Sequence, residues 1–165
     1  MADTTDILRS LNRQRMYEIW QQAKTGNLES LSEEAQLIGK LMLEHEEYHN
    51  HFEFADALED YQFDPENSVN PFLHITIHVV VENQLKLKEP IEAYQFYNSM
   101  RKKKVSHHET IHLIGNILGP LLFQVLKRNE PFDNNLYKRL LKKYKDKKPE
   151  KIYTAIGKEL DFIFR

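Results

Sequence analysis

Residues 70–87 read NPFLHITIHVVVENQLKL, and they settle which kind of secondary structure the chain is built from. Taken alone, the tract HITIHVVV is compatible with a β-strand, because most of its side chains are β-branched. However, Asn70 precedes Pro71, and an Asn that caps followed by a Pro at the first helical position is a strong helix start signal. We therefore predict a buried helix over residues 71–87.

Within this predicted helix, His74, His78 and Glu82 are spaced four residues apart. One helical turn takes 3.6 residues, so the three side chains lie on a single face of the helix. That face is otherwise apolar, with Val81 and Leu85 on it. A histidine among aliphatic neighbours needs partners for both ring nitrogens, and a metal ion together with a hydrogen bond supplies them. We predict that these three residues are metal ligands.

The His-x-x-x-His spacing occurs twice more, in HEEYH with His45 and His49, and in HETIH with His108 and His112. Six of the eight histidines are thus paired, and on a helix each pair forms a two-nitrogen chelate. Two ordinary core or surface histidines would explain any one pair. Three pairs in one small chain favour a shared metal centre inside a bundle of helices.

The remaining sequence also carries helix signals, because apolar residues recur every three or four positions. We predict an all-α, single-domain bundle of about five to seven helices with a His-rich interior. Its core covers about residues 5–144, and residues 145–165 form a C-terminal helical extension. In the first half of the chain we expect a helix over about 5–24, a second helix opened by the capping pattern of residues 30–33, and a loop over about 58–70. In the second half we expect helices that begin after Pro90, Ser106, Pro131 and Pro149. The helix after Ser106 reaches about residue 128, with a kink or break at Pro120.

Composition narrows the class of protein. A hydrophobic share of 41% and a charged share of 29% are typical of a soluble globular chain. No apolar run approaches the roughly 20 residues of a membrane span, and the first residues lack a secretory signal pattern, so we expect a cytoplasmic protein without membrane association. There is no cysteine, so any metal would bind through nitrogen and oxygen.

Charge is distributed unevenly along the chain. Up to residue 100 there are 18 acids against 7 bases, whereas from residue 101 onward there are 16 bases against 7 acids. The densest basic stretch, residues 138–151, could contact nucleic acid or an acidic partner. We favour a solvated helix face and do not expect nucleic acid binding, because no aromatic or arginine-rich pattern accompanies the lysines. The sequence does not identify a small-molecule substrate, and a homo-oligomer is possible.

Counting donors suggests how many ions bind. Six imidazoles and the Glu82 carboxylate exceed what one tetrahedral zinc uses, which favours a dinuclear site. Many imidazoles with few carboxylates differ from ferritin-like di-iron sites and are closer to His-rich, hemerythrin-like bundles. By that analogy we favour iron with oxygen or peroxide chemistry, with zinc or nickel as alternatives, since imidazole binds all of these divalent transition metals.

Three other functions compete with this interpretation. A metal sensor, carrier or partner-binding protein would use the metal to tune folding. A zinc hydrolase would use His108, Glu109 and His112, which match the HExxH motif, but it leaves the other two pairs unexplained. A structural bundle would bind no metal. The sequence assigns no catalytic residue, although Tyr48 could donate a hydrogen bond to an oxygen ligand of the metal or else pack in the core. His51 and His107 lack a partner at the right spacing, and we expect them to be exposed.

The segments HEEYH, NPFLHITIHVVVENQ and HHETIH, in this order, resemble the bacterial domain-of-unknown-function family numbered 1841. The resemblance covers roughly residues 13–143, and the string NPFLH at residues 70–74 is its most specific part. It implies that the histidines at positions 45, 49, 74, 78, 108 and 112 are features shared by the family. It implies no particular activity, and the first dozen residues and the tail from residue 145 look like additions.

Overall fold

The computed structural model describes residues 12–64 and 67–164, and all regular secondary structure in these ranges is helical. The all-α prediction is confirmed. The described residues form eight α-helices and two short 3-10 helices, slightly more α-helices than predicted. The chain divides into two compact units, residues 1–80 and residues 81–165, which are described separately. Residues 5–11 of the first predicted helix lie outside the described residues, and the single-domain organisation stays a prediction.

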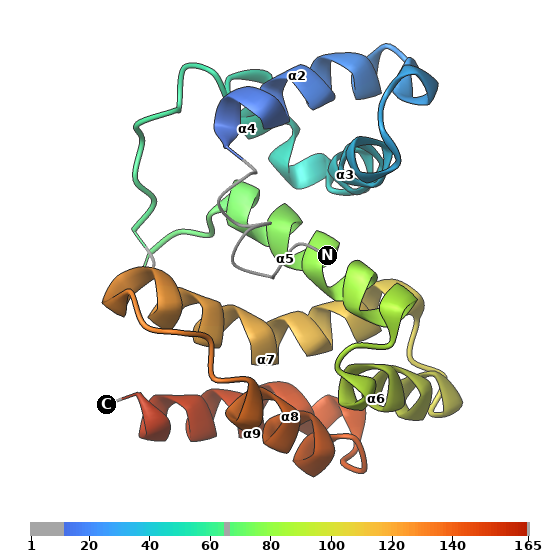
Figure 1. Cartoon of the computed structure of the whole chain (residues 1–165), viewed down its shortest axis with the longest axis vertical. Coiled ribbons are helices and arrows are strands. Elements are labelled where there is room, and N and C mark those ends of the chain that lie inside the picture. Colours follow the sequence, from blue (N-terminus) through green and yellow to red (C-terminus); the bar gives the residue numbers. More distant parts are fainter. Residues whose placement is uncertain (1–11, 65–66, 165) are drawn as a thin grey trace. The chain divides into compact units, whose positions relative to one another are not determined.

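Helices α2, α3 and α4 and the first part of α5 build the first unit (Figure 1). Helix α2 begins after Asn12, whose side chain accepts a hydrogen bond from the backbone N–H of Arg15 at 2.8 Å. Helix α5 begins as the sequence predicts, because the Asn70 side chain accepts from the N–H groups of Phe72 and Leu73 at 3.0 and 3.1 Å. The helical bounds are α2 Arg13–Lys24, η1 Leu28–Ser30, α3 Glu33–Glu44, η2 Glu46–Tyr48, α4 His49–Glu53 and α5 Pro71–Leu87.

The second predicted helix is not continuous. Helix α3 ends at Glu44, the 3-10 helix η2 follows, and α4 resumes at His49. The Nδ1 of His45 lies 2.7 Å from the Leu41 carbonyl, so the side chain takes the acceptor that its own backbone N–H would use in a continuing helix. That N–H bonds to the Met42 carbonyl instead. The glutamate at the end of α3 also interacts unfavourably with the negative end of the helix dipole.

Helices α2 and α3 approach each other closely at Gly39 in α3. A Cβ at this position would lie 3.3 Å from the Cβ of Ala23 in α2 and would overlap the side chain of Leu28. The missing side chain therefore lets α3 pack against α2. Ser32 caps α3, because its Oγ accepts from the N–H of Ala35 at 3.2 Å, whereas Ser30 of the predicted capping pattern lies in η1.

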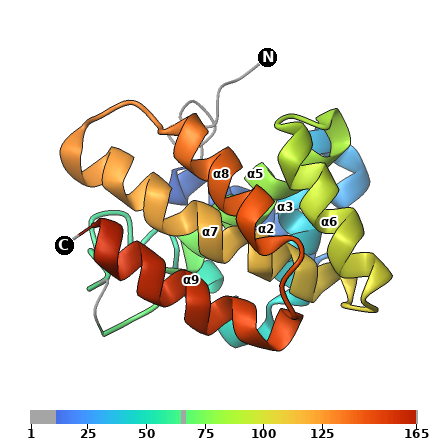
Figure 2. The ribbon, with the colours of Figure 1, turned by 90° about the horizontal axis from the view of Figure 1, so that it is seen from below.

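Helices α6, α7, α8 and α9 belong to the second unit (Figure 2). Helix α7 contacts each of the other three, and its Ser106 cap accepts from the N–H of Glu109 at 3.1 Å, as the capping pattern predicts. The predicted starts near Pro90, Pro131 and Pro149 are also confirmed. The helical bounds are α6 Ile91–Lys102, α7 His107–Arg128, α8 Asn134–Tyr144 and α9 Pro149–Ile163.

Helix α7 runs through Pro120 without ending, so the alternative of a break at this residue is wrong. A proline removes the hydrogen bond to the carbonyl four residues earlier, here that of Asn116. Asn116 is exposed, so water can satisfy that carbonyl and the cost of continuing the helix falls. By length and composition α7 is long and apolar enough to cross a membrane, and half of its apolar stretch is buried in the protein.

Candidate metal centre

Helix α5 brings His74 and His78 together as the spacing predicts. Both residues lie within the uninterrupted helix, and their ring centroids are 4.8 Å apart. His78 is buried, with 3% of its surface exposed, and His74 is partly buried. The neighbouring residues Ile75 and Val79 on the same helix are fully buried in the core of the first unit, so packing holds this part of α5 in place.

His45 joins this pair from the end of α3. A carbonyl can only accept, so His45 Nδ1 donates to Leu41, and in the neutral ring Nε2 then carries the lone pair. This Nε2 lies 3.2 Å from Nε2 of His74. Metal-ligating histidines usually donate their second ring N–H to a carbonyl or carboxylate in this way, which fixes the tautomer and the ring orientation.

The rings of His45, His74 and His78 form a nearly equilateral triangle. The ring centroid of His45 is 4.9 Å from that of His74 and 4.7 Å from that of His78. One nitrogen from each residue lies within 4.8 Å of the other two. Metal–nitrogen bonds of 2.0–2.1 Å at tetrahedral angles place two ligand nitrogens about 3.3–3.4 Å apart. The separation of 3.2 Å between His45 and His74 is close to this value, so the three imidazoles can hold a metal ion.

Tyr48 flanks the triangle. Its ring lies parallel to that of His45 with centroids 6.0 Å apart, and it packs edge-on against His74 at 5.4 Å. Burial raises the pKa of the Tyr48 hydroxyl above its ordinary value, and the negative charge of Glu47 adds to the effect. The phenol therefore stays protonated and can donate a hydrogen bond beside the three histidines.

The structure does not bring His49 into this group, although the spacing predicts it. The helix break separates His45 from His49, and His49 Nε2 donates to the Met42 carbonyl at 3.1 Å. Its ring packs against Trp20 with centroids 4.6 Å apart. Trp20 Nε1 in turn donates to Glu53 at 2.7 Å. Hydrogen bonds from Lys24 and then from Trp20 lower the pKa of Glu53, so this carboxylate anchors the indole against which His49 rests.

The third predicted pair belongs to the second unit. The rings of His108 and His112 on α7 have centroids 4.3 Å apart, as expected for residues four apart on a continuous helix. His108 is exposed and His112 is partly buried. Glu109 is exposed, and its backbone N–H takes part in the capping of α7 by Ser106. The contribution of His108 and His112 to a metal site stays a prediction.

Glu82 has a different partner from the one that the sequence suggests. Its Oε1 lies 2.6 Å from Nε2 of His107, and Nδ1 of the same ring lies 2.8 Å from the hydroxyl of Tyr97. His107 is 51% exposed, as expected, but it is not without partners. Sequence spacing gives no signal for this chain of hydrogen bonds, because its three residues come from α5, α6 and α7. The predicted role of Glu82 as a ligand stays a prediction.

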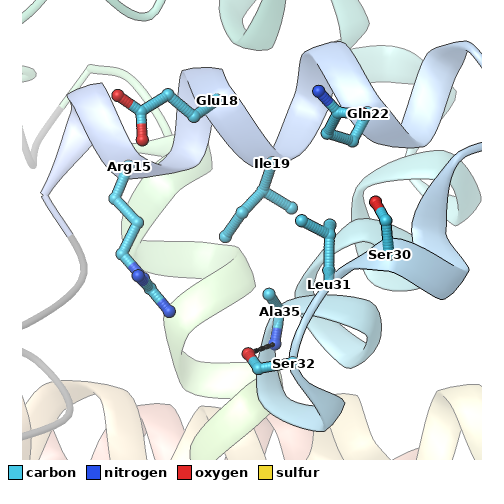
Figure 3. Close-up of a pocket in the computed structure, with 8 residues that line it drawn as sticks. All are labelled: Arg15, Glu18, Ile19, Gln22, Ser30, Leu31, Ser32 and Ala35. Atoms are coloured by element: carbon cyan, nitrogen blue, oxygen red, sulfur yellow. Dashed lines mark hydrogen bonds between the residues drawn. The ribbon is translucent and has the colours of Figure 1, made fainter.

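A surface pocket of about 430 Å³ also occurs in the first unit, between α2 and the start of α3 (Figure 3). None of the predicted site residues lines it. Its hydroxyl from Ser32 already accepts the capping hydrogen bond of α3, drawn in Figure 3. The lining residues are Arg15, Glu18, Ile19, Gln22, Ser30, Leu31, Ser32 and Ala35.

Fold and histidine geometry together define an all-α protein with a group of imidazoles that can hold a metal ion. The model of the family described as Domain of unknown function (DUF1841) matches residues 9–143. The chain belongs to this family, and the match covers the span that the sequence resemblance indicated. No curated protein matches the chain in sequence, and no solved structure matches it.

Proposed function

We propose that this protein binds one divalent transition metal ion through His45, His74 and His78. The observation that carries the proposal is the convergence of three ring nitrogens from two separate segments within 4.8 Å of one another. Two of the three residues, His45 and His78, are almost completely buried. Gathering buried imidazoles costs folding free energy unless their nitrogens share an ion or a hydrogen bond, and a metal ion satisfies all three.

The hydrogen bond from His45 to the Leu41 carbonyl supports this proposal, because it presents the lone pair of Nε2 toward His74. Coordination through Nε2 of His74 requires the neutral ring to carry its proton on Nδ1, because a metal binds only an unprotonated ring nitrogen. Metal uptake is therefore expected to compete with protons. An ion with four ligands would take one further donor besides these three imidazoles, and in catalytic zinc sites that donor is water or substrate.

Iron with oxygen or peroxide chemistry is the finer version of the proposal. An open position next to imidazole ligands suits a small oxygen ligand, and the Tyr48 phenol offers a hydrogen-bond donor beside it. Zinc and nickel fit the same donors. We favour one ion over the two expected from the sequence, because His49 and Glu82 are hydrogen-bonded to the Met42 carbonyl and to His107.

The other functional classes predict different roles for the three histidines of the first unit. A metal sensor or carrier would use the ion to tie the end of α3 to α5, so metal would mainly raise stability. A zinc hydrolase would depend on His108, Glu109 and His112 and not on the three histidines of the first unit.

Elemental analysis of the full chain, purified without a histidine tag, tests the proposal. We expect about one equivalent of iron, zinc or nickel in the wild type and no bound metal in a His45→Ala, His74→Ala, His78→Ala triple variant. Circular dichroism establishes that this variant is still helical. Metal retained by the triple variant but lost from a His108→Ala, His112→Ala variant would overturn the proposal in favour of the hydrolase.

A further inference from the structure

Two basic runs that are far apart in the chain meet within the second unit. Residues 101–104 read RKKK at the end of α6, and residues 145–148 read KDKK after α8. Ser99 Oγ donates to the Lys145 carbonyl at 2.6 Å, and Lys103 Nζ donates to the Lys145 and Lys147 carbonyls at 2.7 and 2.8 Å. We call the cations of these two runs the basic surface: Arg101, Lys102, Lys103, Lys104, Lys145, Lys147 and Lys148.

Local structure fixes the first of these runs. Lys104 adopts a left-handed backbone conformation with φ of 65°, and the N–H of Val105 returns to the Met100 carbonyl at 3.1 Å. The guanidinium of Arg101 donates to the Val105 carbonyl at 2.7 Å. Lys103 interacts favourably with the carbonyls at the C-terminal end of α8, where the helix dipole is negative. The basic surface is therefore held in place before any ligand binds.

Three of the seven cations on the basic surface form no ion pair among the described residues that would hold the fold together. Lys102, Lys104 and Lys148 are exposed, and none forms an ion pair with a carboxylate in the described part of the chain. By contrast, Lys142 and Lys143 on α8 pair with Glu92 and Glu159. A single lysine is enough to cap α8. The seven cations of the basic surface have one carboxylate among them, that of Asp146, so their mutual repulsion destabilises the fold. This excess of positive charge points to an anionic ligand.

We propose that the basic surface binds the phosphate backbone of duplex nucleic acid, a partner that the lysine-rich segment alone did not lead us to expect, because only the fold joins it to the second basic run. Lysines contact phosphates without regard to base sequence, and they release counterions as they do so. Sites for single strands add aromatic side chains on which bases stack. The basic surface offers no aromatic side chain of its own, and Tyr144, which contacts Lys147, is buried. This proposal is independent of the metal site.

Fluorescence anisotropy of the full chain with a labelled 20-base-pair duplex tests the proposal at about 50 mM salt. We expect micromolar binding that weakens steeply as salt increases. Replacing Lys102, Lys104 and Lys148 by Gln should weaken binding at least about tenfold and should lower the slope of log affinity against log salt by about three. A matched variant with Lys127, Arg128 and Lys158 replaced by Gln loses the same charge elsewhere and should bind within about twofold of the wild type.

Absence of wild-type binding at low salt would overturn the proposal, as would equal losses in the two triple variants. Displacement of the duplex by polyglutamate at matched charge would also overturn it, because the surface would then fit an acidic protein. Thermal melts show that each variant folds. The single Lys148→Gln variant, expected to bind about two- to fivefold more weakly, provides the same comparison if the triple variant does not fold.

Discussion

Identical His-x-x-x-His spacings have different outcomes in α5 and at the end of α3. In α5 the helix continues, and His74 and His78 point their rings at each other with centroids 4.8 Å apart. At HEEYH the helix stops at Glu44, so His45 turns toward α5 while His49 bonds to the Met42 carbonyl. In this chain, two histidines four residues apart therefore bring their rings together only where the helix between them is unbroken.

Removal of the two α5 histidines is expected to have the largest effect on metal binding. The His74→Ala, His78→Ala variant loses two of three proposed ligands, so its metal affinity should fall by at least about 100-fold, as even the loss of supporting residues around metal ligands costs 10- to 100-fold. Competition with a chromophoric chelator measures the affinity. An unchanged dissociation constant would mean that α5 does not hold the metal.

The next largest effect is expected where α3, which positions His45, packs on α2. A Gly39→Ala substitution inserts a methyl group against Ala23 and Leu28, which should destabilise the protein by about 1–3 kcal/mol through overpacking. Urea unfolding measures this loss. A variant as stable as the wild type would show that the approach of the two helices is not tight.

The matched control for the α5 pair is His49. A His49→Ala variant should lose about 1–2 kcal/mol of stability, because its ring contact with Trp20 and its hydrogen bond to the Met42 carbonyl disappear. Its metal affinity should stay within about threefold of the wild type. A loss of metal as large as that of the α5 double variant would restore His49 as a ligand and remove the contrast between the two motifs.

The smallest effect concerns Glu53, which holds Trp20 against His49. The pKa of Glu53 is lower in the folded protein than its ordinary value of 4.5. The ionised carboxylate therefore stabilises the fold above pH 4.5, and this stabilisation is lost as the pH falls through the lowered pKa. At neutral pH the Glu53→Gln variant should therefore melt at a lower temperature than the wild type, and the difference should shrink below pH 4.5. A difference in melting temperature that does not change with pH would contradict this role.

Sequence patterns predicted most of the fold because helix starts are local. Asn70 before Pro71 and the Ser106 cap each act within one turn, and both are confirmed. The break at His45 was missed, although His45 and the acidic residues around it carry a readable signal, since both the side-chain hydrogen bond and the helix dipole oppose continuation.

The candidate site was predictable only in part. The four-residue spacing identified His74 and His78. It also identified His45, but only as the partner of His49 on a continuous helix, and the helix is interrupted between these two residues. The partners of Glu82 and His49 depend on contacts between separate helices, which spacing within one segment does not describe. The sequence also does not indicate that the two basic runs lie close together, because only the fold places Lys103 against the carbonyls of Lys145 and Lys147.

X-ray absorption spectroscopy of the metal-loaded full chain tests most directly whether His45, His74 and His78 share one ion. Three imidazole ligands with metal–nitrogen distances of about 2.0–2.1 Å are expected for zinc, and each of the three His→Ala substitutions should reduce the imidazole count by one. A spectrum with oxygen ligands alone, or an imidazole count that the three substitutions leave unchanged, would contradict the account.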